Sequence, residues 1–175
     1  MTNAELTDLM DSWENLQYLA IEIAHNQEHY KLLMEIALFD TNPKSWRAAY
    51  LVDKINDERP ELLIPFLNEL IQQVQIEKST SKKRHFLKLI SLKELIKLQQ
   101  GSMFDFCTKT LVSDDPVAVR VHAMQILHNI AENEPELIPE VVLLIQNEME
   151  KRSSAGIISR GKRLVAKLEI ITNKN

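Results

Sequence analysis

The sequence predicts an all-α fold, and three observations support that prediction. The 175 residues include only three glycines, and aromatic residues make up 6%, which is low for an all-β protein rich in turns. Hydrophobic residues reach 45%, enough to build a core, and they recur at helical spacing. Leucine, isoleucine, glutamate, lysine, glutamine and alanine dominate the composition, and these residues favour helices. We therefore expect a single helical domain over residues 1–175.

Apolar residues at helical spacing predict an N-terminal helix that runs to a stop near His25 and Asn26. A second helix follows and stops at the turn and cap cluster of residues 40–43. The buried positions expected in these two helices are Leu6, Leu9, Met10, Trp13, Leu16, Ala20 and Ile23, then Tyr30, Leu33, Met34, Ala37 and Leu38.

A third helix is expected to open at Asn42 and Pro43, with Trp46 as a core residue. The next helix opens near Pro60 and contains Pro65. Because proline cannot sit deep in an unbroken helix, we expect that helix to begin irregularly.

The middle of the chain predicts a helix that is capped within residues 79–81 and stops at Gly101. Ser102 would then cap a short following helix, in which Cys107 faces inward as a small apolar residue.

Residues 115–130 carry the clearest helical pattern. Asp115 is a good N-cap, and Pro116 suits the first helical position. A second helix opens at Pro135 and meets Pro139, so its start is also expected to be irregular. Residues 153–156 read as a linker before a last helix with an apolar stripe from residue 157 to 171. The apolar face of the first of these helices is Val119, Ala123, Ile126, Leu127 and Ile130.

Two stretches repeat each other. Asn42-Pro43, two residues, then Trp46-Arg47 match Asp115-Pro116, two residues, then Val119-Arg120 in order and spacing. The match continues at Pro60-Glu61-Leu62 against Pro135-Glu136-Leu137. We interpret this match as an internal repeat.

The stretch 115–130 resembles the first helix of a HEAT repeat, whose pattern is Asp-Pro, then Val-Arg, then a small residue, Leu and Ile. The resemblance implies a short right-handed solenoid of about four helix pairs with a C-terminal capping helix. The equivalent arginine in HEAT repeats commonly pairs with an acidic cap of a neighbouring unit, which makes Asp114 or Asp115 a candidate partner here. The positions expected to serve the repeat structure are Trp46, Arg47, Asp115, Pro116 and Arg120.

As a function, the resemblance implies a binding module or scaffold that presents a concave helical groove to another protein. The second helix of each pair usually lines that groove in this family. A partner with a basic helix or segment would suit the acidic parts of the chain, and no cofactor is expected. The partner-binding positions that follow from this are Asn68, Gln72, Glu140 and Asn147.

The alternative is a nucleic-acid-associated protein that uses the basic cluster Lys82, Lys83 and Arg84. DNA alkylation repair enzymes use HEAT-like stacks and resemble this chain in architecture. However, the net charge is -4, and the acidic second helices would repel a duplex.

No set of residues predicts an enzyme or a metal site. His25, Glu28 and His29 match the inverted zinc-peptidase pattern, but they fall in an expected turn, and no third ligand is recognisable. His122 and His128 are six residues apart, so we expect surface or boundary positions on different helical faces.

The sequence also predicts where the protein works. Cys107 is the only cysteine, which fits a reducing compartment. The N-terminus has neither the basic nor the apolar region of a signal peptide, and the apolar run 141–145 is far too short to span a bilayer. We therefore expect a soluble cytoplasmic protein.

Overall fold

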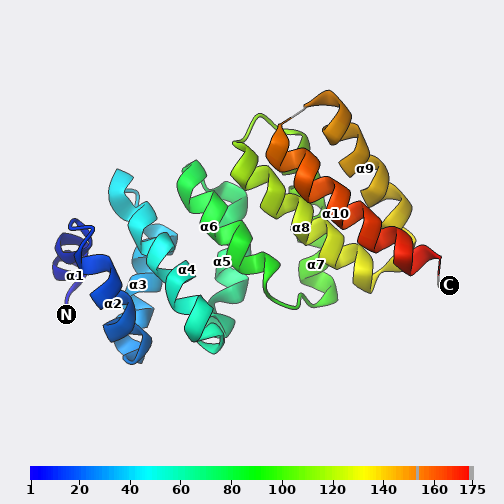
Figure 1. Ribbon diagram of the computed structural model, residues 1–175. Coiled ribbons are helices and arrows are strands. Elements are labelled where there is room, and N and C mark those ends of the chain that lie inside the picture. Colours follow the sequence, from blue (N-terminus) through cyan, green and yellow to red (C-terminus); the bar gives the residue numbers. More distant parts are fainter. Residues whose placement is uncertain (153, 174–175) are drawn as a thin grey trace. The chain divides into compact units, whose positions relative to one another are not determined.

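The computed structural model describes residues 1–152 and 154–173, and no strand occurs among them (Figure 1). The all-α prediction is confirmed. The α-helices are α1 (Asn3–Met10), α2 (Asn15–Ala24), α3 (Gln27–Phe39), α4 (Trp46–Glu58), α5 (Leu67–Ile76), α6 (Thr80–Ser91), α7 (Lys97–Val112), α8 (Val117–Asn133), α9 (Ile138–Lys151) and α10 (Ala155–Thr172). The 3-10 helices are η1 (Pro43–Ser45), η2 (Pro60–Phe66) and η3 (Pro135–Leu137).

The chain forms two compact units, Met1–Leu89 and Ile90–Asn175, which divide inside α6. In the first unit, α4 packs against α2 and α3. In the second unit, α8 packs against α7, α9 and α10. Among the described residues, no helix is both long and apolar enough to cross a membrane. That the whole chain acts as a single domain stays a prediction.

The apolar faces expected from helical spacing form most of the core. In α8, all five positions of the predicted face are buried. In α3 every predicted position is buried, and Ile36, which was not predicted, is buried as well. Leu9 and Trp13 are corrections, because both side chains are exposed instead of buried.

The expected N-terminal helix is broken into α1 and α2 between Asp11 and Glu14. In an unbroken helix, the carbonyls of Met10 and Asp11 would accept the amides four residues on. Here the Arg47 guanidinium donates to both carbonyls, at 3.0 and 2.9 Å. The break is therefore stabilised by a side chain that lies on α4, far along the sequence.

The predicted stop at Gly101 and the predicted cap at Ser102 are wrong. Both residues lie inside α7, and the break comes earlier, between Ser91 and Lys97. The amide of Ile96 donates to the Gln99 side chain at 3.0 Å, which satisfies a donor at the new helix start.

The irregular helix starts expected at the prolines are confirmed. Pro60 and Pro65 lie in η2, and Pro135 opens η3 before α9. At α8 the cap falls one residue later than predicted, since the Pro116 carbonyl accepts the amides of Val119 and Arg120.

The predicted linker 153–156 is shorter than expected. Ser154 caps α10 by accepting the amide of Ile157 at 3.3 Å, so Ala155 and Gly156 already lie in the helix. Ser153, also assigned to the linker, lies outside the described residues.

Candidate protein-binding surface

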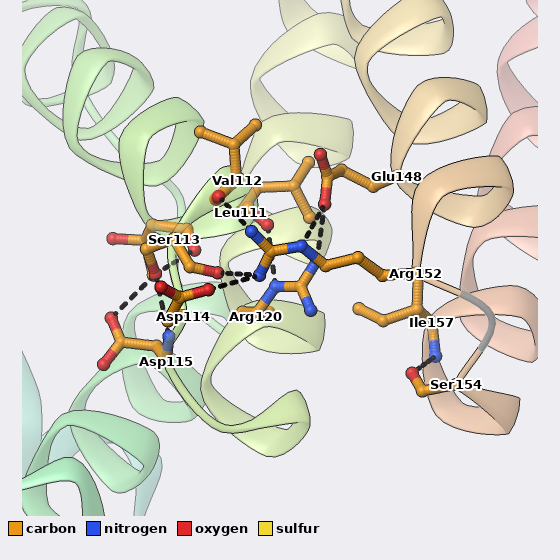
Figure 2. Close-up of polar contacts among 11 residues, drawn as sticks. Leu111, Val112, Ser113, Asp114, Asp115, Arg120, Glu148, Arg152, Ser154 and Ile157 are labelled. Atoms are coloured by element: carbon orange, nitrogen blue, oxygen red, sulfur yellow. Dashed lines mark hydrogen bonds and ion pairs between the residues drawn. The ribbon is translucent and has the colours of Figure 1, made fainter.

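Arginine side chains hold the helix ends of the second unit together (Figure 2). Arg120 is only 4% exposed; its Nε donates to the Leu111 carbonyl at 2.8 Å, and its Nη2 donates to Glu148 Oε2 at 2.6 Å. The bond to Leu111 satisfies one of the carbonyls that a helix leaves open at its C-terminus. Arg120 thus joins the end of α7 to α9 from its place on α8.

A second arginine donates hydrogen bonds at the same C-terminal end of α7. Arg152 donates to the carbonyls of Val112 and Ser113, and it pairs with Asp114 at 3.2 Å (Figure 2). Cations are favourable at a helix C-terminus because the helix dipole is negative there.

The expected partners of the repeated arginines need correction. Arg120 pairs with Glu148 rather than with Asp114 or Asp115, and Asp114 pairs with Arg152. Arg47 pairs with Asp11 at 3.3 Å. Arg47 and Arg120 nevertheless have matching roles, because each donates to a backbone carbonyl at the C-terminal end of another helix in the same unit.

A buried polar cluster links α4 to α6. Asp53 accepts hydrogen bonds from His85 Nδ1 at 2.9 Å and from Lys88 Nζ at 2.6 Å. Arg84 lies 3.0 Å from the other ring nitrogen of His85 and donates to it, so the His85 proton sits on Nδ1. Burial raises the pKa of Asp53, but the bonds from His85 and Lys88 outweigh it and hold that pKa below its ordinary value. The ionised carboxylate is therefore a structural link.

The predicted basic cluster is not uniformly on the surface. Lys82 is buried, pairs with Glu77 at 3.0 Å and donates to the Asp40 carbonyl at 3.1 Å. It cannot reach a phosphate without leaving these partners. Lys83 is half-buried and Arg84 is exposed. Their use in nucleic-acid binding stays a prediction.

A groove of about 380 Å³ lies between α2 and α4 in the first unit. Its α2 wall includes Leu16, Ala20 and Ile21, so its floor is largely apolar. The α4 wall adds the acidic side chains of Asp57 and Glu58. An apolar floor with an acidic edge suits a protein segment that carries apolar and basic residues on one face.

An aromatic cluster, formed by Trp13, Trp46 and Tyr50, adjoins this groove. Trp13 stacks on Tyr50 with ring centroids 5.3 Å apart and lies 6.2 Å from Trp46. Tyr50 also lines the groove, and Lys54 lies 5.7 Å from its ring. Trp46, expected in the core, is half-buried, and Trp13 is 57% exposed. Exposed aromatic side chains of this kind are enriched at protein interfaces.

The outer face of α2, formed by Glu14, Tyr18, Ile21 and Glu22, continues the same surface. Tyr18 is 77% exposed and Ile21 is 60% exposed, with the two carboxylates beside them. Sequence reasoning missed this face. A signal was present, because Tyr18 and Ile21 are large apolar residues that fall outside the apolar stripe of their helix.

The partner-binding positions predicted from the second helices are exposed. Asn68 and Gln72 lie on α5 in the first unit, and Glu140 and Asn147 lie on α9 in the second. Exposure is compatible with a binding role, which stays a prediction.

The histidines and the cysteine occupy structural positions. His25 ends α2 and His29 lies in the first turn of α3, so the pattern does fall across a turn, as predicted. His128 is buried, contrary to the surface or boundary position expected, and Cys107 is buried as predicted. Burial raises the pKa of the Cys107 thiol, which makes it a poor nucleophile. Within residues 1–152 and 154–173, no group of three or more metal-ligating side chains comes together.

The family model described as a HEAT repeat domain matches residues 5–168. No curated protein and no solved structure matches the chain.

Proposed function

The chain belongs to the HEAT repeat family, and from this membership we propose that it is a non-enzymatic protein-interaction module. HEAT repeats bury their apolar faces against neighbouring repeats and offer the remaining helical surfaces to partners. The observation that carries the proposal is the exposed apolar surface of the first unit, where Ile21 lines the groove between α2 and α4 and Tyr18 is exposed on the same helix.

The chemistry of this surface indicates the kind of partner. Its apolar residues would pack against the apolar side of a partner helix. Basic residues beside that apolar side would pair with Glu14, Glu22, Asp57 and Glu58. We therefore propose a protein partner with a basic amphipathic helix. Identification of the partner by affinity capture would show which process the interaction serves.

The test is affinity capture of tagged protein from the source cells, with identification of captured proteins and nucleic acid. The variant Tyr18→Glu/Ile21→Glu adds charge to the proposed surface, and its partner should be lost. Leu143→Glu is the matched control, because Leu143 is 59% exposed on α9 in the second unit. Loss of the same partner from both variants, or from neither, would contradict the proposed surface.

Two further variants in the same capture experiment test the other candidate binding residues. The variant Gln72→Arg/Asn147→Arg tests the polar positions on the second helices. If nucleic acid is captured and Lys83→Ala/Arg84→Ala releases it, the basic cluster is the binding site instead. Such binding would weaken steeply as salt is raised, because phosphate contacts release counterions.

A further inference from the structure

Opposite charges are concentrated at α1–α2 and at α10. The first lysine or arginine of the chain is Lys31, so the segment that contains α1 and α2 is free of both. In α10 the balance is reversed, with Glu169 as its acidic residue. The acidic residues before Lys31 are Glu5, Asp8, Asp11, Glu14, Glu22 and Glu28; the basic residues of α10 are Arg160, Lys162, Arg163 and Lys167.

The helical register of α10 places its cations around an exposed apolar strip. Its buried side faces α8 and α9 and includes Gly161, Leu164 and Leu168. At 100° per residue, Ala166 and Ile170 fall on the opposite side, and Ile170 is 55% exposed. The basic face of α10 is defined by these two residues with Lys162, Arg163 and Lys167, and all five are exposed.

The outer face of α2 has the complementary arrangement. Tyr18 and Ile21 point away from the buried side of α2, which includes Leu16, Leu19 and Ile23. Glu14 and Glu22 flank the two apolar residues on that outer side. Two large apolar side chains that lie exposed next to each other indicate a surface that is covered in the working protein.

We propose that the outer face of α2 binds the basic face of α10 of a second copy of this chain. This inference rests on the proposed function, since it names the partner of the same surface. Tyr18 and Ile21 would pack on Ala166 and Ile170, while Glu14 and Glu22 would meet Arg163, Lys162 and Lys167. The match in both polarity and charge favours a second copy, because both faces occur in every chain and therefore at equal concentration.

A contact between two different faces has a further consequence. It is heterologous, so a pair joined by one contact has a second face of each kind, which can close a ring or add further copies. Exposed ion pairs contribute little each, and one helix face is a small interface. The association is therefore expected to be weak, to increase with concentration and to fall with added salt.

The test is sedimentation velocity of the full chain from micromolar to millimolar concentration, at low and at moderate salt. The weight-average sedimentation coefficient of the wild type should rise with concentration and should be lower at moderate salt than at low salt. Glu14→Lys/Glu22→Lys and Arg163→Glu/Lys167→Glu should each weaken the association at least about tenfold, because each places like charges together. Glu150→Lys, an exposed reversal on α9, is the matched control and should leave it unchanged.

Mixing the two charge-reversed variants gives the decisive result. In the mixture, the reversed α2 face of one variant meets the reversed α10 face of the other, and the two unchanged faces also meet. Association should therefore return to near the wild-type level. A wild type that stays monomeric, a loss in only one variant, or a mixture that does not recover would each overturn the inference. If any of these results were found, the proposed function would still hold as long as cellular capture depended on Tyr18 and Ile21. If capture did not depend on them, the proposed function would be overturned together with this inference.

Discussion

Arg47, Arg120 and Arg152 each replace amide donors that are missing at the end of a neighbouring helix. Each guanidinium reaches carbonyls at a helix C-terminus and also pairs with a carboxylate. Arginine suits this role because its planar fork presents several donors in fixed directions. Lysine at the same positions would offer a single charge centre and could not satisfy two acceptors in the same geometry.

Arg120 should be the most sensitive of these residues. Arg120→Met leaves the buried Glu148 carboxylate with the more distant Arg152, at 3.7 Å, which costs about 3 kcal/mol of unfolding free energy. Urea denaturation followed by circular dichroism measures this loss. The double variant Arg120→Met/Glu148→Met should be more stable than the single variant, because the carboxylate is gone as well.

The exposed Arg163→Met serves as the control and should change the unfolding free energy by less than about 0.5 kcal/mol. A double variant as unstable as Arg120→Met alone would contradict the explanation by a buried carboxylate.

His128 should make stability depend on pH. Its buried ring lies near Glu132, Asn129 and Lys167, and burial is the largest cause of a pKa below the ordinary 6.5. The unfolded chain therefore binds a proton at a higher pH than the folded chain. The stabilisation is fully present above about pH 6.5 and is lost as pH falls through the folded pKa.

The measurement compares the unfolding free energy of wild type and His128→Gln from pH 8 to pH 5. The difference between the two proteins should shrink toward acid pH. An NMR titration midpoint for His128 at or above 6.5 would contradict the account.

At the scale of elements, α9 and α10 approach closely because position 161 carries no side chain. A Cβ built on Gly161 would lie 2.6 Å from Met149 Sδ and 3.0 Å from Ile145 Cγ2. Gly101, by contrast, lies exposed inside α7 with nothing within 4 Å of such a Cβ. The same substitution should therefore have opposite effects at the two sites.

Gly101→Ala should stabilise the protein by about 0.5–1 kcal/mol, because alanine favours the helix and restricts the unfolded chain. Gly161→Ala should destabilise it by about 1 kcal/mol, since the side chains of α9 must move. Thermal melting of both variants measures whether each melting temperature rises or falls relative to the wild type. A higher melting temperature for Gly161→Ala than for Gly101→Ala would contradict the packing argument.

The sequence was sufficient to predict elements whose signals are local. The face of α8, the cap of α6 near Ser79 and the irregular starts at Pro60 and Pro135 follow from neighbouring residues. The break between α1 and α2 could not be predicted in this way, because its carbonyls are satisfied by Arg47 on α4. Gly101 misled the prediction because glycine at an exposed helix position costs little enough to be tolerated.

At the scale of the whole molecule, function depends on where charged and apolar residues gather. The acidic segment with α1 and α2 and the basic α10 are plain in the sequence, whereas the exposure of the apolar residues at their centres is established by the structure. Those centres depend on which side of α2 and of α10 faces its own unit. The basic cluster illustrates the same limit, since the burial of Lys82 depends on Glu77 and on the Asp40 carbonyl.

The central claim is that the outer face of α2 binds protein, and photo-crosslinking in the source cells tests it most directly. A benzophenone-bearing phenylalanine analogue would replace Tyr18, which is exposed and aromatic, and in a separate protein would replace Leu143 on α9. The account predicts protein adducts from position 18 that are absent from position 143. Adducts from position 143 alone, or adducts to nucleic acid in place of protein at position 18, would contradict it.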